Sequence, residues 1–215
     1  AKAATFKAVL KEIQYENFNA CKAEFEIRGF NVHPGEGKDT MINASLVAIE
    51  INNCLPSMET PRGTEDYEGF YHLISMQGEV GEAKLNYIVR DHDKNGFEER
   101  KKTLRLIEKN LNAKWGEGTV TLKITDQYLN MKEIVEEHMH LIDHAKKACE
   151  AAGVAPLILP IRGGTDGCQL SFKGLPCPNL GTGGHAFHGP YEHISVEGME
   201  KSVELLLALI QEYTK

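Results

Sequence analysis

Residues 22–29 read Lys-Ala-Glu-Phe-Glu-Ile-Arg-Gly, and this stretch decides the fold of the first half of the chain. Its apolar residues, Ala23, Phe25 and Ile27, alternate with charged residues. Alternation with a period of two is typical of a strand that buries one face and exposes the other. The stretch therefore predicts a half-buried β-strand, which a Pro-Gly turn after His33 then interrupts.

Five more elements follow this strand along the chain. A helix is expected to begin near Asp39 or Thr40, either of which is a suitable N-cap, and to end near Cys54. Two strands, a helix and a last strand are expected at 70–76, 83–91, 96–111 and 118–126. This order is typical of a ferredoxin-like βαββαβ domain, which we assign to residues 18–126. The fold class is therefore α/β (α+β), with helices packed on a sheet.

The residues on either side of this domain are organised differently. Residues 1–17 are a lead-in segment, whose first dozen residues read as a short helix. Residues 127–215 combine a helix that ends at Gly153, a buried strand in Pro-Leu-Ile-Leu-Pro-Ile at 156–161 and a final helix capped by Ser195. A segment with so few strands cannot cover its own apolar faces and strand edges. We therefore expect 127–215 to complete a larger domain whose N-terminal part is absent.

The composition excludes several classes of protein. Hydrophobic residues make up 41% of the chain and charged residues 26%, a balance typical of globular proteins. The net charge of -7 argues against a nucleic-acid partner, and no apolar run is long enough to span a membrane. The N-terminal residues lack the apolar core of a signal peptide. The five cysteines are never at C-x-x-C spacing, so we expect reduced thiols and a cytoplasmic protein.

Two glycine-rich stretches contain residues that are suited to chemistry. In Ile-Arg-Gly-Gly-Thr-Asp-Gly, at 161–167, glycines let the backbone approach a ligand, and Arg162 is able to clamp a carboxylate through two parallel hydrogen bonds. A tight turn whose arginine pairs with a structural acid explains this pattern equally well. The stretch 181–193 contains His185 and His188, which suit zinc but are too few for a site, so incidental surface histidines explain it better when it is taken alone.

Three more histidines have local sequences that suggest catalytic roles. His33, fixed between a strand and a Pro-Gly turn, is able to donate a ring N–H to a developing oxyanion, although an exposed turn histidine is the simpler interpretation. His140 and His144 have the i,i+4 spacing that binds zinc in H-E-x-x-H proteases. Residue 141 is leucine rather than the glutamate that would act as base, which favours a solvated helix face.

Six strings of sequence are distributed along the chain from Tyr15 to Lys201. They are YENFNA (15–20), NVHPGEGKDTMINA (31–44), YEGFYHLISMQG (67–78), YIVRDHD (87–93), IRGGTDGCQLSFKGLPCPNLGTGG (161–184) and FHGPYEHISVEGMEK (187–201). In this order they resemble the peptidase T family, a branch of the co-catalytic zinc aminopeptidases, carboxypeptidases and aminoacylases. The resemblance implies a metallopeptidase that releases the N-terminal residue of tripeptides with a water activated by two zinc ions.

The resemblance implies roles for four residues around the metals and the substrate. His188 corresponds to the last ligand of the two-zinc cluster, and Glu192 to a partner that orients this histidine. Arg90 and Arg162 correspond to groups that bind the carboxylate end or the backbone of the substrate.

The same resemblance implies a lid and a partner subunit. The ferredoxin-like domain corresponds to a lid that also forms a homodimer. His33 corresponds to a lid histidine that reaches the scissile carbonyl, in several relatives from the partner subunit, and Asn43 assists at the same place. The remaining zinc ligands and the glutamate base of the family lie upstream of the lid and have no counterpart here, so we expect the isolated chain to be inactive.

Two alternatives stay open at the level of sequence. One keeps the architecture and changes the substrate, which gives a dipeptidase, a carboxypeptidase or an acylase. The other is a non-enzyme, in which the ferredoxin-like domain is a dimerisation module and the rest of the chain is a docking element.

Overall fold

The computed structural model describes residues 10–214, which belong to two compact units. The first, Phe18–Leu129, is called the ferredoxin-like unit below. The second, called the terminal unit, combines the described residues up to Asn17 with those from Asn130 onward. The two stretches of chain that form the terminal unit are joined by a hydrogen bond: the side-chain oxygen of Asn17 accepts from the Met131 amide at 2.9 Å.

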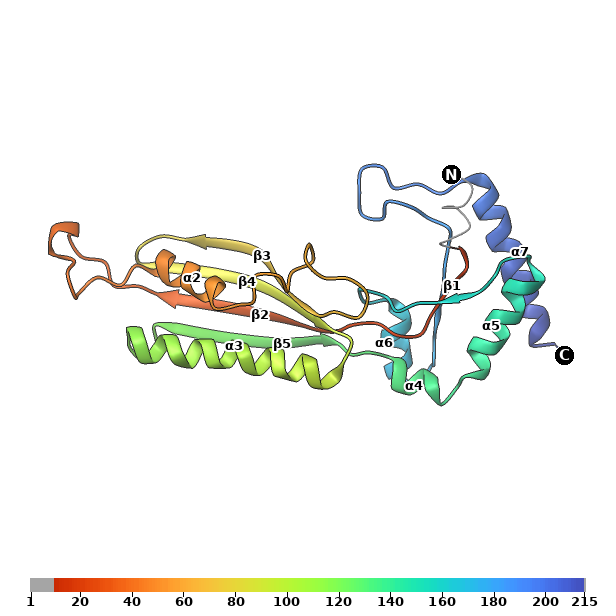
Figure 1. The fold of residues 1–215 in the computed structure, drawn as a ribbon, viewed down its shortest axis with the longest axis horizontal. Coiled ribbons are helices and arrows are strands. Elements are labelled where there is room, and N and C mark those ends of the chain that lie inside the picture. Colours follow the sequence, from red (N-terminus) through yellow and green to blue (C-terminus); the bar gives the residue numbers. More distant parts are fainter. Residues whose placement is uncertain (1–9, 215) are drawn as a thin grey trace. The chain divides into compact units, whose positions relative to one another are not determined.

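The ferredoxin-like unit contains the predicted elements in the predicted order. They are β2 (Asn19–Arg28), α2 (Ala44–Asn53), β3 (Phe70–Gly78), β4 (Glu82–Asp91), α3 (Lys94–Trp115) and β5 (Val120–Tyr128). The strands form one antiparallel sheet in the order β3-β4-β2-β5, and a one-turn 3-10 helix, η1 (Pro34–Glu36), lies between β2 and α2 (Figure 1). The predicted mixed α/β fold is confirmed.

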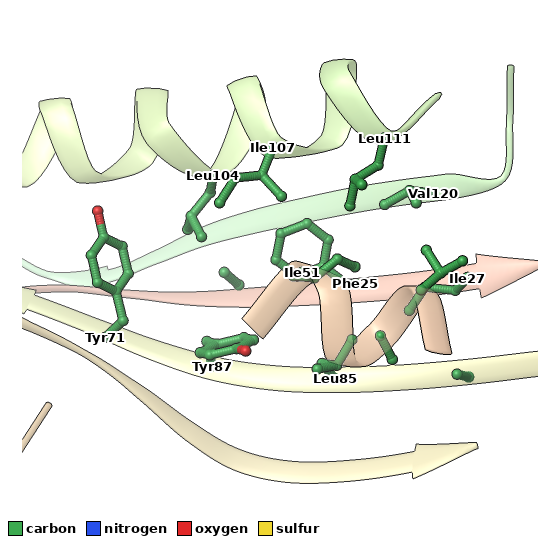
Figure 2. Close-up of a cluster of buried hydrophobic side chains, with 14 of the residues drawn as sticks. Phe25, Ile27, Ile51, Tyr71, Leu85, Tyr87, Leu104, Ile107, Leu111 and Val120 are labelled. Carbon is green, nitrogen blue, oxygen red and sulfur yellow. The ribbon is translucent and has the colours of Figure 1, made fainter. Parts of the chain in front are cut away.

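The core of this unit lies between the sheet and its two helices (Figure 2). Alternate residues of β2, among them Phe25 and Ile27, point into the core, as the period of two predicts. The apolar stripe of α3 is buried against them through Leu104, Ile107 and Leu111. Burying a side chain of this size is worth about 1.5–3 kcal/mol, so this single core accounts for much of the unit's stability.

The start of α2 differs from the prediction. The helix begins at Ala44, and its N-cap is Asn43 rather than Asp39 or Thr40. Asp39 has a φ of 59°, in the left-handed region, so it lies in a turn that precedes the helix. The side chain of Asn43 accepts a hydrogen bond from the Leu46 amide at 3.3 Å and thereby satisfies one of the free N–H groups of the first turn.

The terminal unit is built from short strands and longer helices. Its elements are β1 (Glu12–Gln14), α4 (Lys132–Glu136), α5 (His140–Ala151), β6 (Leu157–Ile158), α6 (Asp166–Phe172), β7 (Asn179–Leu180) and α7 (Val196–Glu212). β1 is central in a three-stranded sheet, with β6 parallel on one side and β7 antiparallel on the other. α5 and α7 pack together, and the ring of His144 meets that of Tyr213 edge-on at 4.5 Å.

Two helix ends of this unit agree with the sequence. Gly153 has a φ of 71° just after α5, and the Val154 amide bonds back to the Cys149 carbonyl at 2.8 Å, which is the pattern of a glycine C-cap. Ser195 caps α7 by accepting a hydrogen bond from the Gly198 amide at 3.2 Å. None of the helices in residues 10–214 has the length and apolar character needed to cross a membrane.

Of the two remaining expectations for the terminal unit, one falls mostly outside the described residues and the other is wrong. Residues 1–9 of the helix expected in the first dozen residues lie outside the described residues, Leu10 is helical, and β1 begins at Glu12. The apolar run at 156–161 forms a strand of two residues, and Leu157 and Ile158 are 36% and 37% exposed rather than buried. The reason is position: β6 is an edge strand, whereas Ile13 in the central β1 is fully buried.

Candidate functional site

His33 lies in the long loop that joins β2 to α2. The loop extends beyond the end of the sheet (orange in Figure 1), and the side chain of His33 is exposed. Its Nδ1 accepts a hydrogen bond from the Gly35 amide at 3.2 Å. A ring nitrogen that accepts a hydrogen bond cannot carry the proton, so the neutral ring has its N–H at Nε2. The turn at Pro34 and Gly35 therefore gives His33 an outward-facing donor of the kind that an oxyanion requires.

Arg90 lies near the end of β4 and is only 9% exposed. Its Nη1 donates to the carbonyl oxygens of Val89 at 2.9 Å and Cys21 at 3.4 Å, and its guanidinium lies 5.3 Å from the centre of the Tyr128 ring. No ion pair within residues 10–214 joins Arg90 to a carboxylate. A buried guanidinium without a carboxylate has unused capacity for an anion.

His33 and Arg90 belong to opposite ends of the same sheet. In the pairing of β2 with β4, Arg28 lies opposite Glu82 at the end that continues to His33, whereas Ala20 lies opposite Arg90 at the other end. Both strands have 10 residues. At about 3.3 Å per residue, the two ends of the sheet are roughly 30 Å apart. The fold therefore does not bring His33 and Arg90 of one chain together.

Arg162 follows β6 at the start of the glycine-rich turn and is half-buried. Thr165 caps α6 by accepting a hydrogen bond from the Cys168 amide at 3.3 Å. A side chain at Gly167 would come within 2.4 Å of the Cys177 carbonyl oxygen, so this glycine is required by close contact within the chain itself. Packing within the chain is therefore enough to explain the glycine at position 167, without a ligand.

His188 lies in a loop that precedes α7, and its imidazole is exposed. Its backbone φ of 62° is in the left-handed region, which residues other than glycine rarely adopt. The carboxylate of Glu192 accepts a hydrogen bond from the His188 amide at 3.2 Å. Glu192 therefore contacts His188 through the backbone amide, and its role in orienting His188 stays a prediction.

The loop that contains His188 is flanked by His185 and His193, for which the sequence did not predict a pairing. His185 and His193 face each other in an antiparallel bridge, with ring centroids 5.3 Å apart and planes 26° apart. The spacing of the two histidines around His188 is visible in the sequence, but only the hairpin shows that they pair.

The described residues do not by themselves assemble a metal centre. Across residues 10–214, no three or more His, Cys, Asp or Glu side chains lie close enough together to hold a metal ion. An exposed imidazole such as that of His188 fits the chemistry of a zinc ligand, but a catalytic zinc site needs about three such groups from the protein. The six candidate residues are divided between the units: His33, Asn43 and Arg90 in the ferredoxin-like unit, Arg162, His188 and Glu192 in the terminal unit.

An apolar pocket of about 440 Å³ lies in the terminal unit beside α7. It is lined by Leu180, Gly181, Thr182, Ile194, Met199, Ser202, Leu205 and Leu206. None of the candidate residues and no ionisable side chain lines it, so the pocket is an uncovered apolar surface rather than a reaction site.

Comparison with known proteins identifies the family. Residues 15–119 match the peptidase dimerisation domain. The chain is 51% identical over 206 residues to a peptidase T from Caldanaerobacter subterraneus, which covers 96% of this chain and 50% of the relative. A peptidase T from Clostridium perfringens is 54% identical over 204 residues, with 95% and 50% covered. This chain is a homologue of peptidase T. It spans about half the length of the curated peptidase T relatives it matches.

Solved structures of peptidases share the peptidase T homologue's fold. Aminopeptidase PepT from Bacillus cereus has a TM-score of 0.80 at 22% identity, covering 96% of this chain and 55% of that protein. A tripeptidase from Staphylococcus aureus has a TM-score of 0.81 at 16% identity, covering 94% and 53%. A Bacillus subtilis protein described as a dinuclear metal-binding peptidase of the M20 family has a TM-score of 0.64 at 15% identity, covering 94% and 53%.

Proposed function

We propose that this chain supplies the lid and the C-terminal part of a zinc-dependent aminopeptidase that releases the N-terminal residue of tripeptides. The observation that carries the proposal is identity of 51–54% to peptidase T over almost the whole chain. In this proposal His188 is one ligand of a two-zinc cluster, and Glu192 holds its backbone. When bound, the zinc ions would polarise the scissile carbonyl and lower the pKa of the attacking water.

The chain's own residues would bind and orient the peptide. Arg90 and Arg162 would hold the substrate's carboxylate or backbone, for which the buried guanidinium of Arg90 is suited because it lacks a carboxylate partner in the described residues. His33 would donate its Nε2–H to the oxyanion, with assistance from Asn43.

We further propose that His33 acts on a substrate held by a second copy of the chain. An extended tripeptide spans about 11 Å at most, whereas the two ends of the sheet that lead to Arg90 and His33 are roughly 30 Å apart. One tripeptide therefore cannot touch both residues of one chain. Mixing a His33→Ala chain with an Arg90→Ala chain, both in the presence of the matching N-terminal half of a peptidase T relative, tests this: turnover above that of either variant alone is expected, and no such gain would contradict action across copies.

A homodimer through the ferredoxin-like unit is part of the same proposal, and the match to a peptidase dimerisation domain supports it. The edge strand β3 and the adjacent α2 expose apolar side chains, with Ile74 at 55% and Leu46 at 61%. Unpaired edge strands with apolar neighbours favour pairing with another strand. Light scattering should show that Ile74→Lys lowers the dimer fraction, whereas Thr125→Lys on the opposite edge strand, β5, does not.

The remaining part of the proposed assembly is the portion that corresponds to the half of peptidase T that this chain does not match. Its binding surface would include the exposed edge of β6 and the exposed apolar face of α7, where Val203 and Ile210 are 56% and 61% exposed. Five free cysteines are consistent with a reducing, cytoplasmic location for the assembly.

The deciding experiment measures zinc content and tripeptide hydrolysis, first for the 215-residue chain and then after addition of the matching N-terminal half of a peptidase T relative. We expect turnover only in the mixture. Two bound zinc ions with full turnover by the chain alone would contradict the need for a second portion. Comparison of free tripeptides, N-blocked peptides and N-acyl amino acids in the active mixture then identifies the substrate, and a preference for N-acylated compounds would favour an acylase.

A further inference from the structure

We propose that His185 and His193 are positioning residues, whose stacked rings clamp the two ends of loop 186–192 and thereby hold His188 where it can meet a metal ion. The proposal rests on the proposed role of His188 as a zinc ligand. It assigns to this ring pair a function that is separate from ligation.

The backbone of the loop is closed by reciprocal hydrogen bonds. The His185 amide donates to the His193 carbonyl at 2.8 Å, and the His193 amide donates to the His185 carbonyl at 3.1 Å. Within the loop, the Gly189 amide donates to Ala186 at 3.0 Å, and the Glu192 amide donates to Gly189 at 3.1 Å. Two consecutive turns thus lie between the bridged residues, with His188 in the first.

The conformation of this loop is unfavourable without such closure. Ala186 and His188 have φ values of 54° and 62°, and neither is glycine. Left-handed backbone at residues with a Cβ persists only where surrounding contacts hold it, and it is concentrated at functional sites. The contacts that hold it here are the bridge between His185 and His193 and the carboxylate of Glu192 on the His188 amide.

The two imidazole rings reinforce the bridge. Their centroids are 5.3 Å apart and their planes are nearly parallel, so they are stacked across the base of the loop. Nδ1 of His193 lies 2.7 Å from the Tyr191 carbonyl oxygen. Because a carbonyl oxygen only accepts hydrogen bonds, Nδ1 must carry the proton, and this bond fixes the orientation of the His193 ring.

Stacking argues against the alternative that these histidines are themselves metal ligands. A metal ion binds an imidazole in the plane of the ring, at a nitrogen, whereas stacked rings turn their faces toward each other. No three or more potential ligands come together around them within residues 10–214. Stacking of the ring faces therefore explains the arrangement of His185 and His193 better than metal binding by their nitrogens does.

Substitution separates the stack from the nitrogens. His193→Ala removes the stack, while His193→Phe keeps an aromatic face without a ring nitrogen. In the 215-residue chain we expect His193→Ala to raise the amide exchange rates of His185 and His188 by about tenfold or more, because local opening becomes easier. The Phe variant should restore protection to within about threefold of the original chain. Unchanged amide exchange in α7 shows that the unit stays folded.

Two results would overturn the clamp. One is unchanged exchange at His188 in His193→Ala. The other is a Phe variant that exchanges as fast as the Ala variant, since it would show that a ring nitrogen, not the stacked face, holds the loop. His185→Phe, which keeps a stack from the other side, provides an independent check and should also preserve slow exchange.

A zinc titration then distinguishes the clamp from the proposed function. In the mixture of this chain with the matching N-terminal half of a peptidase T relative, with Zn²⁺ as the probe and the His188 ring nitrogens followed by NMR, loss of the stack in His193→Ala should weaken apparent affinity about tenfold, in the range typical of groups that support a ligand. If Zn²⁺ leaves the His188 signal of the unaltered chain unchanged in this mixture, the role of His188 as a ligand fails. The exchange measurements would still decide whether the rings clamp the loop.

Discussion

At the scale of single residues, Asn43 has two proposed uses that substitution can separate. Its side-chain oxygen caps α2 through the Leu46 amide. Asn43→Ala should lower the free energy of unfolding by about 1 kcal/mol, whereas Asn43→Asp should keep the cap because a carboxylate also accepts from this amide. Urea unfolding followed by circular dichroism measures both values, and equal stability of the Ala variant and the original chain would exclude the cap.

The Asn43→Asp variant also tests the substrate role of Asn43. An ionised carboxylate at this position has no N–H to donate, so a role in donating to the substrate predicts reduced turnover in the active mixture despite normal stability. Normal turnover by Asn43→Asp would leave Asn43 as a helix cap alone.

Two buried side chains of the core, the thiol of Cys21 and the hydroxyl of Tyr87, predict how stability changes at alkaline pH. Burial, with the nearby charge of Asp126, raises the pKa of Cys21 to about 12, and burial raises the pKa of Tyr87 to about 12. Between about pH 9 and 12 these groups ionise in the unfolded chain but stay neutral in the folded one. The unfolded state then binds fewer protons, so stability is intact below about pH 9 and falls as the pH rises toward 12, by at most about 1.4 kcal/mol per pH unit for each group.

Urea unfolding at pH 8, 9, 10 and 11 measures this loss of stability. Tyr87→Phe removes one ionising group and should flatten the decline above pH 10, although it also removes the hydrogen bond to Asn52 at 3.0 Å. Thiol reactivity at pH 8 checks separately that Cys21 is buried. The exposed Cys54 should react with a thiol reagent, while Cys21 should not. A decline of the same slope in Tyr87→Phe would contradict the assignment to Tyr87.

At the scale of secondary-structure elements, the sheet of the terminal unit predicts unequal costs for two isoleucines that pair with each other. Ile13 in β1 is fully buried, while Ile158, its partner in β6, is 37% exposed. Ile13→Ala should destabilise the terminal unit by about 2–4 kcal/mol, and Ile158→Ala by less than half as much, because less apolar surface is lost. Amide exchange within α5 and α7 measures the local effect, and equal costs would mean that β6 is covered in solution.

The elements that were predicted well and those that were not differ in length. Strands β2 and β4 have 10 residues each, which gives the period of two enough repeats to be recognised. β6 and β7 have two residues each, too few for any period, so the apolar run at 156–161 favours a buried strand on sequence alone. Nothing local to that run indicates that β6 lies at the edge of its sheet.

At the scale of the whole molecule, the two units predict different resistance to opening. The ferredoxin-like unit has a continuous core between one sheet and two helices, whereas strands of two or three residues form the sheet of the terminal unit. Hydrogen exchange should therefore show slower amides in residues 18–126 than in residues 127–215 of the monomeric chain. Equal protection in a monomer would mean that the terminal unit does not need the partner proposed to cover it.

The candidate site combines what the sequence could and could not supply. The sequence and its family resemblance singled out His33, Arg90 and His188 by their motifs. The structure added what surrounds them: the Gly35 amide on His33, the Tyr128 ring beneath Arg90, and the Glu192 carboxylate on the backbone of His188. These partners depend on loop conformations and strand register, which no residue pattern encodes directly.

The sequence by itself determined the ferredoxin-like unit, because alternating strands and a regular helical stripe commit each segment locally to one face of one core. Only the tertiary structure decided where α2 begins, which strand lies at the centre of the terminal sheet and how His185 and His193 pair. The physical reason is that these features arise from hydrogen bonds and ring contacts that form after the chain has turned back on itself, as β1 does between strands more than a hundred residues away in sequence.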